Sequence, residues 1–248
     1  MVKALVQFIE TSFETAKFKR AIVALSGGVD SSTSAALAVR ALGCENVYPL
    51  LLPYGNLNPQ TVVDAQLVAK TLGIPPVNMT EINIQPLVDP IVAIDLSMDR
   101  VRRGNIMARV RMILLYDAAK KRNALVVGTE NKTEYLLGYF TRFGDEASDI
   151  EPLQNLFKTQ VYELARELEL PEQILLKTPT AGLWEGQTDE DEFGFTYKEA
   201  DEILATIVDK KQSIDEVVLK GYDRATVEKV MKRMKDNAYK HHLPLIPQ

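Results

Sequence analysis

The sequence predicts an α/β fold, a three-layer structure in which a mostly parallel, twisted sheet is flanked by helices. Short continuous apolar runs, which are typical of strands buried on both faces, recur in the first half of the chain. They alternate with longer segments of helical periodicity, as expected of βαβ units. No linker-like stretch divides the 248 residues, so we expect a single domain over residues 1–248.

The first half of the chain supplies the predicted sheet. A helix is expected over Ala4–Phe18, where apolar residues follow helical spacing. The predicted strands are Ala21–Leu25, Val47–Leu52, Pro76–Ile82 and Ala124–Val127. The predicted helices between them are Ser31–Leu42, Pro59–Leu72 and Asn105–Arg122. Gly43 and Gly73 follow two of these helices, where glycine commonly ends a helix.

The final third is expected to be mainly helical. We predict helix over most of Glu151–Leu170, ended by Pro171, because proline cannot continue a helix. Thr180–Asp191 is polar and contains glycine, which predicts a mobile segment, and Asp189–Glu192 is interpreted as a solvated acidic loop. Surface helices are predicted at Tyr197–Val208, Ile214–Lys220 and Ala225–Tyr239.

Composition makes a cytoplasmic, soluble enzyme the default expectation. The net charge is −5, and the basic stripe that nucleic-acid-binding proteins carry is not visible, so no nucleic-acid partner is expected. No apolar run reaches the ~18 residues of a membrane span, so no membrane partner is expected either. The single cysteine, Cys44, cannot form an internal disulfide, which fits a reducing compartment.

The most informative segment is a loop that links the first predicted strand to the following helix, Ser26-Gly27-Gly28-Val29-Asp30-Ser31-Ser32. Glycines let the backbone approach a ligand closely, and a helix N-terminus presents free N–H groups to an anion, so the loop predicts a phosphate cradle. It is not a Walker A loop, because no Gly-Lys-Ser/Thr ends it. A carboxylate at Asp30 inside an anion site implies a cation, Mg²⁺. An ordinary glycine-rich turn is the alternative.

A second turn, Gly128-Thr129, follows the predicted strand Ala124–Val127. The carboxyl ends of parallel strands meet at one edge of a sheet, where ligands of such sheets bind. We therefore expect this turn to lie on the same rim as the loop that contains Asp30, although the two are far apart in sequence.

The loop resembles the SGGxDS signature of the ATP pyrophosphatase (PP-loop) superfamily, which splits ATP into AMP and pyrophosphate. Further segments resemble the ammonia-dependent NAD synthetases within it: Gly104–Met112, Gly128–Glu134, Gly144–Leu153, Lys177–Trp184 and Gln187–Glu190. This resemblance runs from about residue 21 to the end of the chain. It implies an adenine nucleotide alpha hydrolase-like fold.

The resemblance also implies an activity, the amidation of nicotinic acid adenine dinucleotide (deamido-NAD). In this family ATP adenylates the nicotinate carboxylate, pyrophosphate leaves, and ammonia displaces AMP to give NAD. Mg²⁺ is the implied metal, ATP the co-substrate, and a homodimer the implied assembly. The apolar side of Ile106–Tyr116 could form part of the dimer interface, or it could pack on the sheet.

The match implies roles for individual residues. ATP would be bound by the loop Ser26–Ser32 together with Thr129, Lys158 and Thr180, and Lys158 would neutralise phosphate charge. Asp30 and Glu134 would be the Mg²⁺ ligands. Without the resemblance, Glu134 is equally a first-turn helix acid and Lys158 a solvated lysine.

Deamido-NAD would be held by Arg109, Arg142, Asp149, Tyr239 and Lys240. Arg142 stands where some relatives carry lysine, and Tyr239 where some carry histidine. Arg109 and Arg111 are two residues apart on one predicted helix, so they face different directions and one of them could be a surface cation. Asp145 would receive ammonium and take its proton, which makes Asp30, Lys158 and Asp145 the candidate catalytic residues.

Other functions remain alternatives. A tRNA-thiolating ligase would need a basic face and cysteines, whereas a GMP-synthetase-like amidating ligase is closer in chemistry. A non-catalytic nucleotide-binding sensor on the same scaffold could lack Asp30, Glu134 or Lys158, but all three are present. Glutamine-dependent relatives carry an extra amidase domain for which this chain is too short, so free ammonia is the expected nitrogen donor.

Overall fold

The computed structural model describes residues 1–242, and in them it contains one parallel sheet with the strand order β3-β2-β1-β4. The strands are β1 (Ala21–Ala24), β2 (Val47–Leu51), β3 (Thr80–Glu81) and β4 (Leu125–Val127). Ala21 pairs in parallel with Val47 on one side and with Leu125 on the other. The predicted α/β class with a parallel sheet is confirmed.

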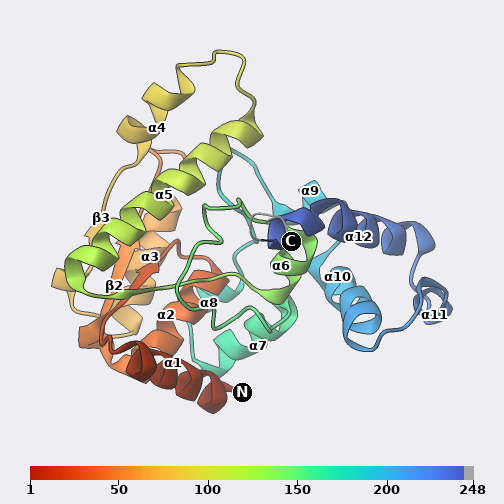
Figure 1. Cartoon of the computed structure of the whole chain (residues 1–248), viewed down its shortest axis with the longest axis horizontal. Helices are drawn as coiled ribbons and strands as arrows, with labels where there is room; N and C mark the ends of the chain where they lie inside the picture. The colour runs from red at the N-terminus through yellow and green to blue at the C-terminus, as the bar shows by residue number, and fades with distance from the viewer. Residues whose placement is uncertain (243–248) are drawn as a thin grey trace, which may run out of the picture.

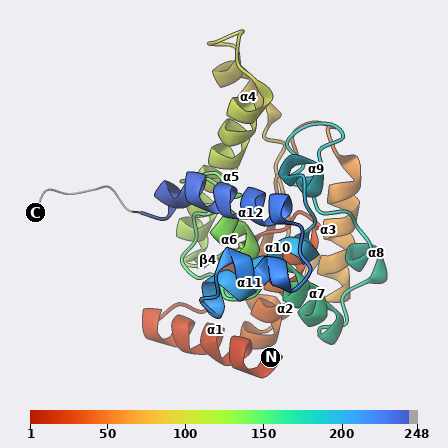
Figure 2. The ribbon, with the colours of Figure 1, turned by 90° about the vertical axis from the view of Figure 1, so that its right-hand side faces the viewer.

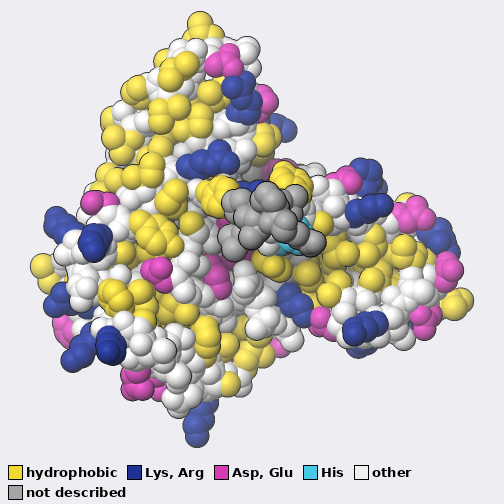
Figure 3. All heavy atoms as spheres, viewed as in Figure 1, with side chains coloured by type: hydrophobic (Ala, Val, Ile, Leu, Met, Phe, Trp, Pro, Cys, Tyr) yellow, Lys and Arg dark blue, Asp and Glu magenta, His cyan; other side chains and the backbone are white. Residues whose placement is uncertain are grey.

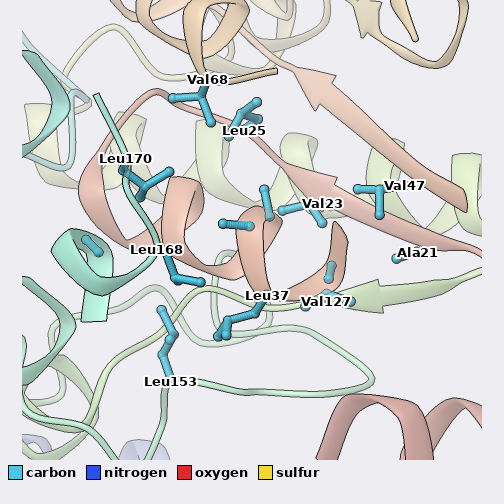
Figure 4. Close-up of a cluster of buried hydrophobic side chains, with 14 of the residues drawn as sticks. Ala21, Val23, Leu25, Leu37, Val47, Val68, Val127, Leu153, Leu168 and Leu170 are labelled. Atoms are coloured by element: carbon cyan, nitrogen blue, oxygen red, sulfur yellow. The ribbon is translucent and has the colours of Figure 1, made fainter. Parts of the chain in front are cut away.

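One face of the sheet packs on α1 (Val2–Ala16), α2 (Val29–Leu42), α3 (Pro59–Thr71), α7 (Lys158–Glu167) and α8 (Glu172–Leu175). Figure 4 shows the centre of this core, in which Val23 of β1 and Val127 of β4 lie in one cluster with Leu37 of α2. All three side chains are almost completely buried. Their transfer from water is the main force that fixes α2 against the sheet.

The opposite face is covered by α4 (Gln85–Val92) and α5 (Arg100–Arg122), which project together as an arm at one end of the molecule (Figures 1 and 2). Ile22 and Val126 belong to this second core, whereas the next residues, Val23 and Val127, belong to the first. Successive side chains of a strand point to opposite faces. Burial on both faces therefore explains the continuous apolar runs.

The C-terminal helices form a lobe with a core of its own, on the right in Figure 1. Its helices are α9 (Asp189–Phe193), α10 (Tyr197–Leu204), α11 (Ile214–Leu219) and α12 (Arg224–Asn237), with a π-helical turn at Ala205–Asp209 and a 3-10 turn at Ala238–His241. Helix α6 (Lys132–Leu137) joins this core through Leu137. The three predicted surface helices exist, but their inner sides are buried. The single domain over residues 1–248 stays a prediction.

Two predicted boundaries in the first half were wrong. The strand predicted at Pro76–Ile82 is a 3-10 turn at Pro76–Asn78 followed by a two-residue edge strand, because Pro75 and Pro76 cannot donate to a sheet ladder. Another 3-10 turn, Cys44–Asn46, precedes β2. The helix predicted from Asn105 begins at Arg100, since the Asp99 carboxylate caps it by accepting from the Arg102 N–H.

The prediction of helix over most of Glu151–Leu170 was also wrong at its start, because α7 begins only at Lys158. The preceding residues bond to distant backbone instead of to a helical turn. The Gly128 N–H donates to the Ile150 carbonyl at 2.8 Å, and the Lys132 N–H donates to the Leu156 carbonyl at 2.8 Å. Tertiary hydrogen bonds, and not the helical periodicity of the sequence, therefore determine the backbone conformation of this segment. They hold it beside the end of β4.

In the part of the chain that the structure describes, no helix has both the length and the apolar character needed to cross a membrane. The cytoplasmic location stays a prediction.

Candidate active site

A cavity of about 440 Å³ opens at the carboxyl edge of the sheet. Its walls come from the ends of β1 and β2, the loop after β1, residues 177–184 and the C-terminal lobe. Thr129 and Thr180 both line it, from turns far apart in sequence. Because β1 lies between β2 and β4, the chain reverses strand order here, and ligands of open α/β sheets bind at such a point. The expectation of one shared rim is confirmed.

The loop after β1 has a backbone conformation and a close approach to α3 that require glycine at one position. Gly27 has φ +67°, and a Cβ there would lie 2.5 Å from the Asp64 Cβ. The Ser31 hydroxyl accepts from the Ser26 N–H at 3.2 Å, and the Ser32 hydroxyl donates to the Gly28 carbonyl at 2.7 Å. Of the predicted phosphate-binding residues, five line the cavity: Ser26, Gly28, Val29, Asp30 and Ser31. Gly27 and Ser32 do not, and their contacts shape the loop.

The loop is anchored from below by a buried carboxylate that sequence reasoning did not single out. Asp64 of α3 is 1% exposed and accepts from Lys177 at 2.6 Å, from Gln60 at 2.8 Å and from Gln173 at 2.5 Å. The Lys177 ammonium also donates to the Gly27 carbonyl at 3.2 Å. Burial alone would raise the pKa of Asp64, but these hydrogen bonds hold it below its usual value.

Asp30 and Glu134 meet at one point, as the sequence predicts, and Lys158 lies between them. The Lys158 Nζ is 2.5 Å from the Asp30 Oδ2 and 3.1 Å from the Glu134 Oε1. Asn131 fixes the pair, because its amide donates to Asp30 at 2.9 Å and its oxygen accepts from the Glu134 N–H at 3.0 Å. Lys158 is 2% exposed, so the interpretation of a solvated lysine was wrong.

The charges of this trio are strongly coupled. Burial favours neutral Lys158, but the two carboxylates outweigh it and raise the pKa of its ammonium well above the usual value. Burial also raises the pKa of Glu134 to about 7, although Lys158 opposes the shift. Near neutral pH the trio therefore holds a fixed ammonium at Lys158 and, at Glu134, a carboxyl that can gain or lose a proton.

The same residues suit a hard cation. Mg²⁺ typically takes one or two carboxylates and completes its shell with phosphate oxygens and water. The described residues include no cluster of three or more His, Cys, Asp or Glu side chains placed to hold a metal. The ammonium of Lys158 contacts both Asp30 and Glu134, so two carboxylates that converge beside a phosphate loop fit an ion that a nucleotide would help to bind.

A hydrogen-bond chain connects Glu134 with the segment that carries Thr180. The Asp189 carboxylate accepts from the Ala181 N–H at 3.0 Å and from the hydroxyls of Tyr139 and Tyr197, each at 2.9 Å. The Tyr197 hydroxyl also lies 3.2 Å from the Glu134 Oε1. The interpretation of Asp189–Glu192 as a solvated acidic loop was wrong in two respects: the segment is helix α9, and Asp189 is only 3% exposed, although the three acids that follow are exposed. The burial of Asp189 could not be inferred from four consecutive acids.

Asp145 opens into the cavity, where Arg111 is its cationic neighbour. Its carboxylate accepts from the Thr141 N–H at 2.9 Å. Desolvation by the surrounding protein raises its pKa, but the residue is exposed, so this shift is smaller than for the buried acids of the site. The Arg111 guanidinium donates to the Leu52 carbonyl at 3.1 Å, and burial lowers its pKa to about 10. Arg109 is exposed and does not line the cavity, so of the two arginines it is Arg111 that faces the site.

Most residues predicted to hold the dinucleotide lie outside the cavity wall. Arg142 donates to the backbone carbonyl of His242, Asp149 accepts from a backbone N–H of β4 at 2.7 Å, and Tyr239 is 61% exposed. Only Lys240 of this group lines the cavity, with its ammonium 2.6 and 2.9 Å from two backbone carbonyls. A role in binding the dinucleotide stays a prediction for all of them.

Two acids near Thr129 were not predicted: Glu130, which is buried, and Glu151, which is partly buried. Glu151 accepts from the Glu130 N–H at 3.1 Å and from the Ser148 hydroxyl at 2.8 Å, and Glu130 accepts from Gln154 at 3.2 Å. A Cβ at Gly128 would fall 1.8 Å from a Glu151 oxygen, so a larger residue there would force the Glu151 side chain to move. Burial first, and then repulsion from neighbouring carboxylates, raises the pKa of Glu130 to about 9; burial raises that of Glu151 to about 8.

Comparison with known proteins gives one consistent family. The family model described as NAD synthase matches residues 1–244. The NH(3)-dependent NAD(+) synthetase of Pyrococcus furiosus is 47% identical over 250 residues, covering 100% of this chain and 94% of the relative. The same enzyme of Fusobacterium nucleatum is 42% identical over 242 residues, covering 98% of this chain and 93% of the relative.

Solved structures agree. The NMN synthetase of Francisella tularensis has a TM-score of 0.86 and 38% identity, covering 99% of this chain and 96% of that one. The NH3-dependent NAD synthetase of Campylobacter jejuni, in complex with the nitrate ion, has a TM-score of 0.84 and 32% identity, covering 100% and 97%. The matches span the sheet, the loop after β1 and the C-terminal lobe, and the chain belongs to the NAD synthase family.

Proposed function

We propose that this protein is an ammonia-dependent NAD synthetase, a ligase that converts deamido-NAD, ATP and ammonia into NAD, AMP and pyrophosphate. The observation that carries this proposal is the convergence of Asp30 and Glu134 on Lys158, beside a glycine-rich loop in the cavity. The family relationship supports the reaction type and ATP as co-substrate.

ATP would be bound at the loop Ser26–Ser32, where the N–H groups at the start of α2 face the cavity. Thr129 and Thr180 would contact it from opposite walls. Asp30 and Glu134 would hold Mg²⁺, which when bound neutralises charge that develops on the phosphates. Lys158, already beside both carboxylates, would neutralise the pyrophosphate as it leaves.

The reaction has two steps. An oxygen of the nicotinate carboxylate attacks the α-phosphorus of ATP, and the bond to the β-phosphate oxygen breaks. Ammonia then attacks the carboxyl carbon, and AMP leaves with the oxygen that linked it. Asp145 would receive ammonium and accept its proton, since its exposed carboxylate lines the cavity in which the two steps would take place.

The residues implied to hold the dinucleotide lie both inside the cavity and outside its wall. Lys240 would contact it inside the cavity, and Arg109, Arg142, Asp149 and Tyr239 would contact it where it extends beyond the wall. Arginine side chains suit its phosphates, because the guanidinium can donate two parallel hydrogen bonds.

We also propose a homodimer. The arm formed by α4, α5 and the residues between them has exposed apolar side chains that a second copy could cover, and Figure 3 shows apolar surface in its upper part. The exposed apolar residues of the arm include Leu87, Ile91, Ile94, Leu96 and Val101. Light scattering after size exclusion should give twice the 27.7 kDa of one chain. A monomer at micromolar concentration would contradict this assembly.

Pyrophosphate release tests the reaction. It should require ATP, Mg²⁺, ammonia and deamido-NAD together, and equal stimulation by xanthosine monophosphate or tRNA would overturn the assignment. Nucleotide binding without any turnover would instead support a sensor. Because one structural relative is an NMN synthetase, nicotinic acid mononucleotide is the competing acceptor. A higher kcat/KM with the mononucleotide would move the proposed product from NAD to NMN.

Substitution of Asp30, one of the two proposed Mg²⁺ ligands, is the most direct test of the metal role. Asp30→Asn keeps the shape of the side chain but removes its charge, so turnover should fall by at least about 10²-fold while the circular dichroism spectrum is unchanged. Asp215→Asn is the matched control, because Asp215 lies on α11 with a side chain that is 76% exposed. Near-normal turnover in Asp30→Asn would contradict the proposed metal role.

A further inference from the structure

Arg233 lines the cavity, but it has no role in the sequence-based predictions or in the proposed mechanism. It belongs to α12 in the C-terminal lobe and lines the cavity. Its guanidinium lies over the rings of Phe193 and Tyr139, with the central carbon 4.7 and 5.3 Å from the two ring centres. Two aromatic faces therefore hold the guanidinium in place without using its N–H donors.

The other basic side chains of the cavity wall all have oxygen partners. Lys158 contacts two carboxylates, Lys177 contacts one carboxylate, and Lys240 and Arg111 donate to backbone carbonyls. Among the described residues, Arg233 makes no ion pair or side-chain hydrogen bond, and its Nε is buried without a partner.

A buried donor without an acceptor is unfavourable, and a guanidinium carries five N–H donors in a fixed fork. Burial accordingly lowers the pKa of Arg233, although nearby Tyr139 and Glu192 oppose the shift. No acid of the described chain is placed to pair with the guanidinium. An anion that enters the cavity would supply the missing acceptors.

We propose that Arg233 binds a phosphate group of a substrate, through charge-assisted hydrogen bonds from its guanidinium. The inference rests on the proposed function, in which both nucleotide substrates carry phosphates. Phosphate matches the planar fork with two parallel hydrogen bonds, which a lysine ammonium cannot reproduce. The phosphate comes either from ATP or from deamido-NAD, and the C-terminal lobe thereby contributes directly to substrate binding.

Direct binding separates the two sources. The dissociation constants of ATP and of deamido-NAD are measured by calorimetry for the parent chain, Arg233→Met and Arg233→Lys, with adenosine as the ligand that lacks phosphate. We expect Arg233→Met to weaken one of the two nucleotides by about 10- to 100-fold and adenosine by less than twofold. Arg233→Lys should recover only part of the loss. The KM of the same nucleotide should rise accordingly.

The neighbouring Lys232 provides the matched control. Its side chain is 76% exposed on the same helix, so Lys232→Met should leave both affinities unchanged. The melting temperature of each variant shows whether Arg233 contributes to the stability of the fold, separately from its effect on affinity. If Arg233→Met binds both nucleotides within twofold of the parent chain, whatever its melting temperature, the proposal is wrong. If Arg233→Met is too unstable to assay, Arg233→Lys is the test. Unchanged affinities of Arg233→Lys for both nucleotides would then show that the proposal is wrong.

These measurements also distinguish the two proposals. If the parent chain binds ATP but releases no pyrophosphate, the synthetase function is contradicted. The contact between Arg233 and phosphate is then judged only from the dissociation constants. Unchanged affinities in Arg233→Met of an active enzyme would contradict only the role of Arg233.

Discussion

The buried carboxyl of Glu130 predicts an unusual dependence of stability on pH. Its pKa is raised from an ordinary 4.5 to about 9, so between these values the folded chain keeps a proton that the unfolded chain releases. A raised folded-state pKa gives stability that is present at low pH and lost as pH rises. Because the folded chain holds one more proton than the unfolded chain, the free energy of unfolding falls by about 1.4 kcal/mol for each unit by which the pH rises between these two values.

Glu130→Gln removes that proton exchange and keeps the shape of the side chain. From pH 6 to pH 8, the parent chain should therefore lose about 3 kcal/mol more of its free energy of unfolding than the variant does, since two pH units separate the measurements. Glu151 stays in both chains, so the comparison isolates Glu130.

Urea unfolding followed by far-ultraviolet circular dichroism at pH 6, 7 and 8 measures these free energies. Glu228→Gln is the matched control, because Glu228 has a side chain that is 60% exposed. It should show the pH dependence of the parent chain. If Glu130→Gln also follows the parent chain at all three pH values, the reasoning about a retained buried proton is refuted.

Three further perturbations have expected outcomes. Lys158→Met leaves two buried carboxylates without their cation and should lower the free energy of unfolding by about 3 kcal/mol in urea titrations, whereas a cost below 1 kcal/mol would mean that the ammonium is not needed there. Gly128→Ala places a Cβ 1.8 Å from a Glu151 oxygen and should lower the melting temperature by several degrees; an unchanged value would show that Glu151 can move freely. Asp64→Asn weakens the contact with Lys177 below the loop and should raise the KM for ATP about tenfold, and an unchanged KM would argue against its anchoring role.

The sequence predicts the parts of this fold in which local pattern and packing agree. The strand Ala21–Ala24 and the loop after it are recognisable because an apolar run buried on both faces ends in glycines. The segment before Lys158 is not, since tertiary hydrogen bonds tie Ile150 to the end of β4 and Leu156 to the start of α6, and only short turns form between them. The same holds for the two-residue edge strand, Thr80–Glu81, whose length depends on its neighbour.

The candidate site divides in a similar way. Asp30, Glu134 and Lys158 were predicted because a family pattern marks them; on its own, Lys158 suggests a solvated lysine. Asp189 and Arg233 were missed, because acids and arginines of helical segments are usually exposed and nothing local signals their burial. Only the tertiary packing of the C-terminal lobe turns them toward the cavity.

The ammonium of Lys158 has a consequence for how the site comes into being. It holds Asp30 and Glu134 side by side before any nucleotide arrives, so the two loops need not be brought together by the ligand. The ordering of these loops is thus achieved when the chain folds. A nucleotide that binds there meets two carboxylates already held in place, and more of its binding free energy is available for holding the reacting atoms in line.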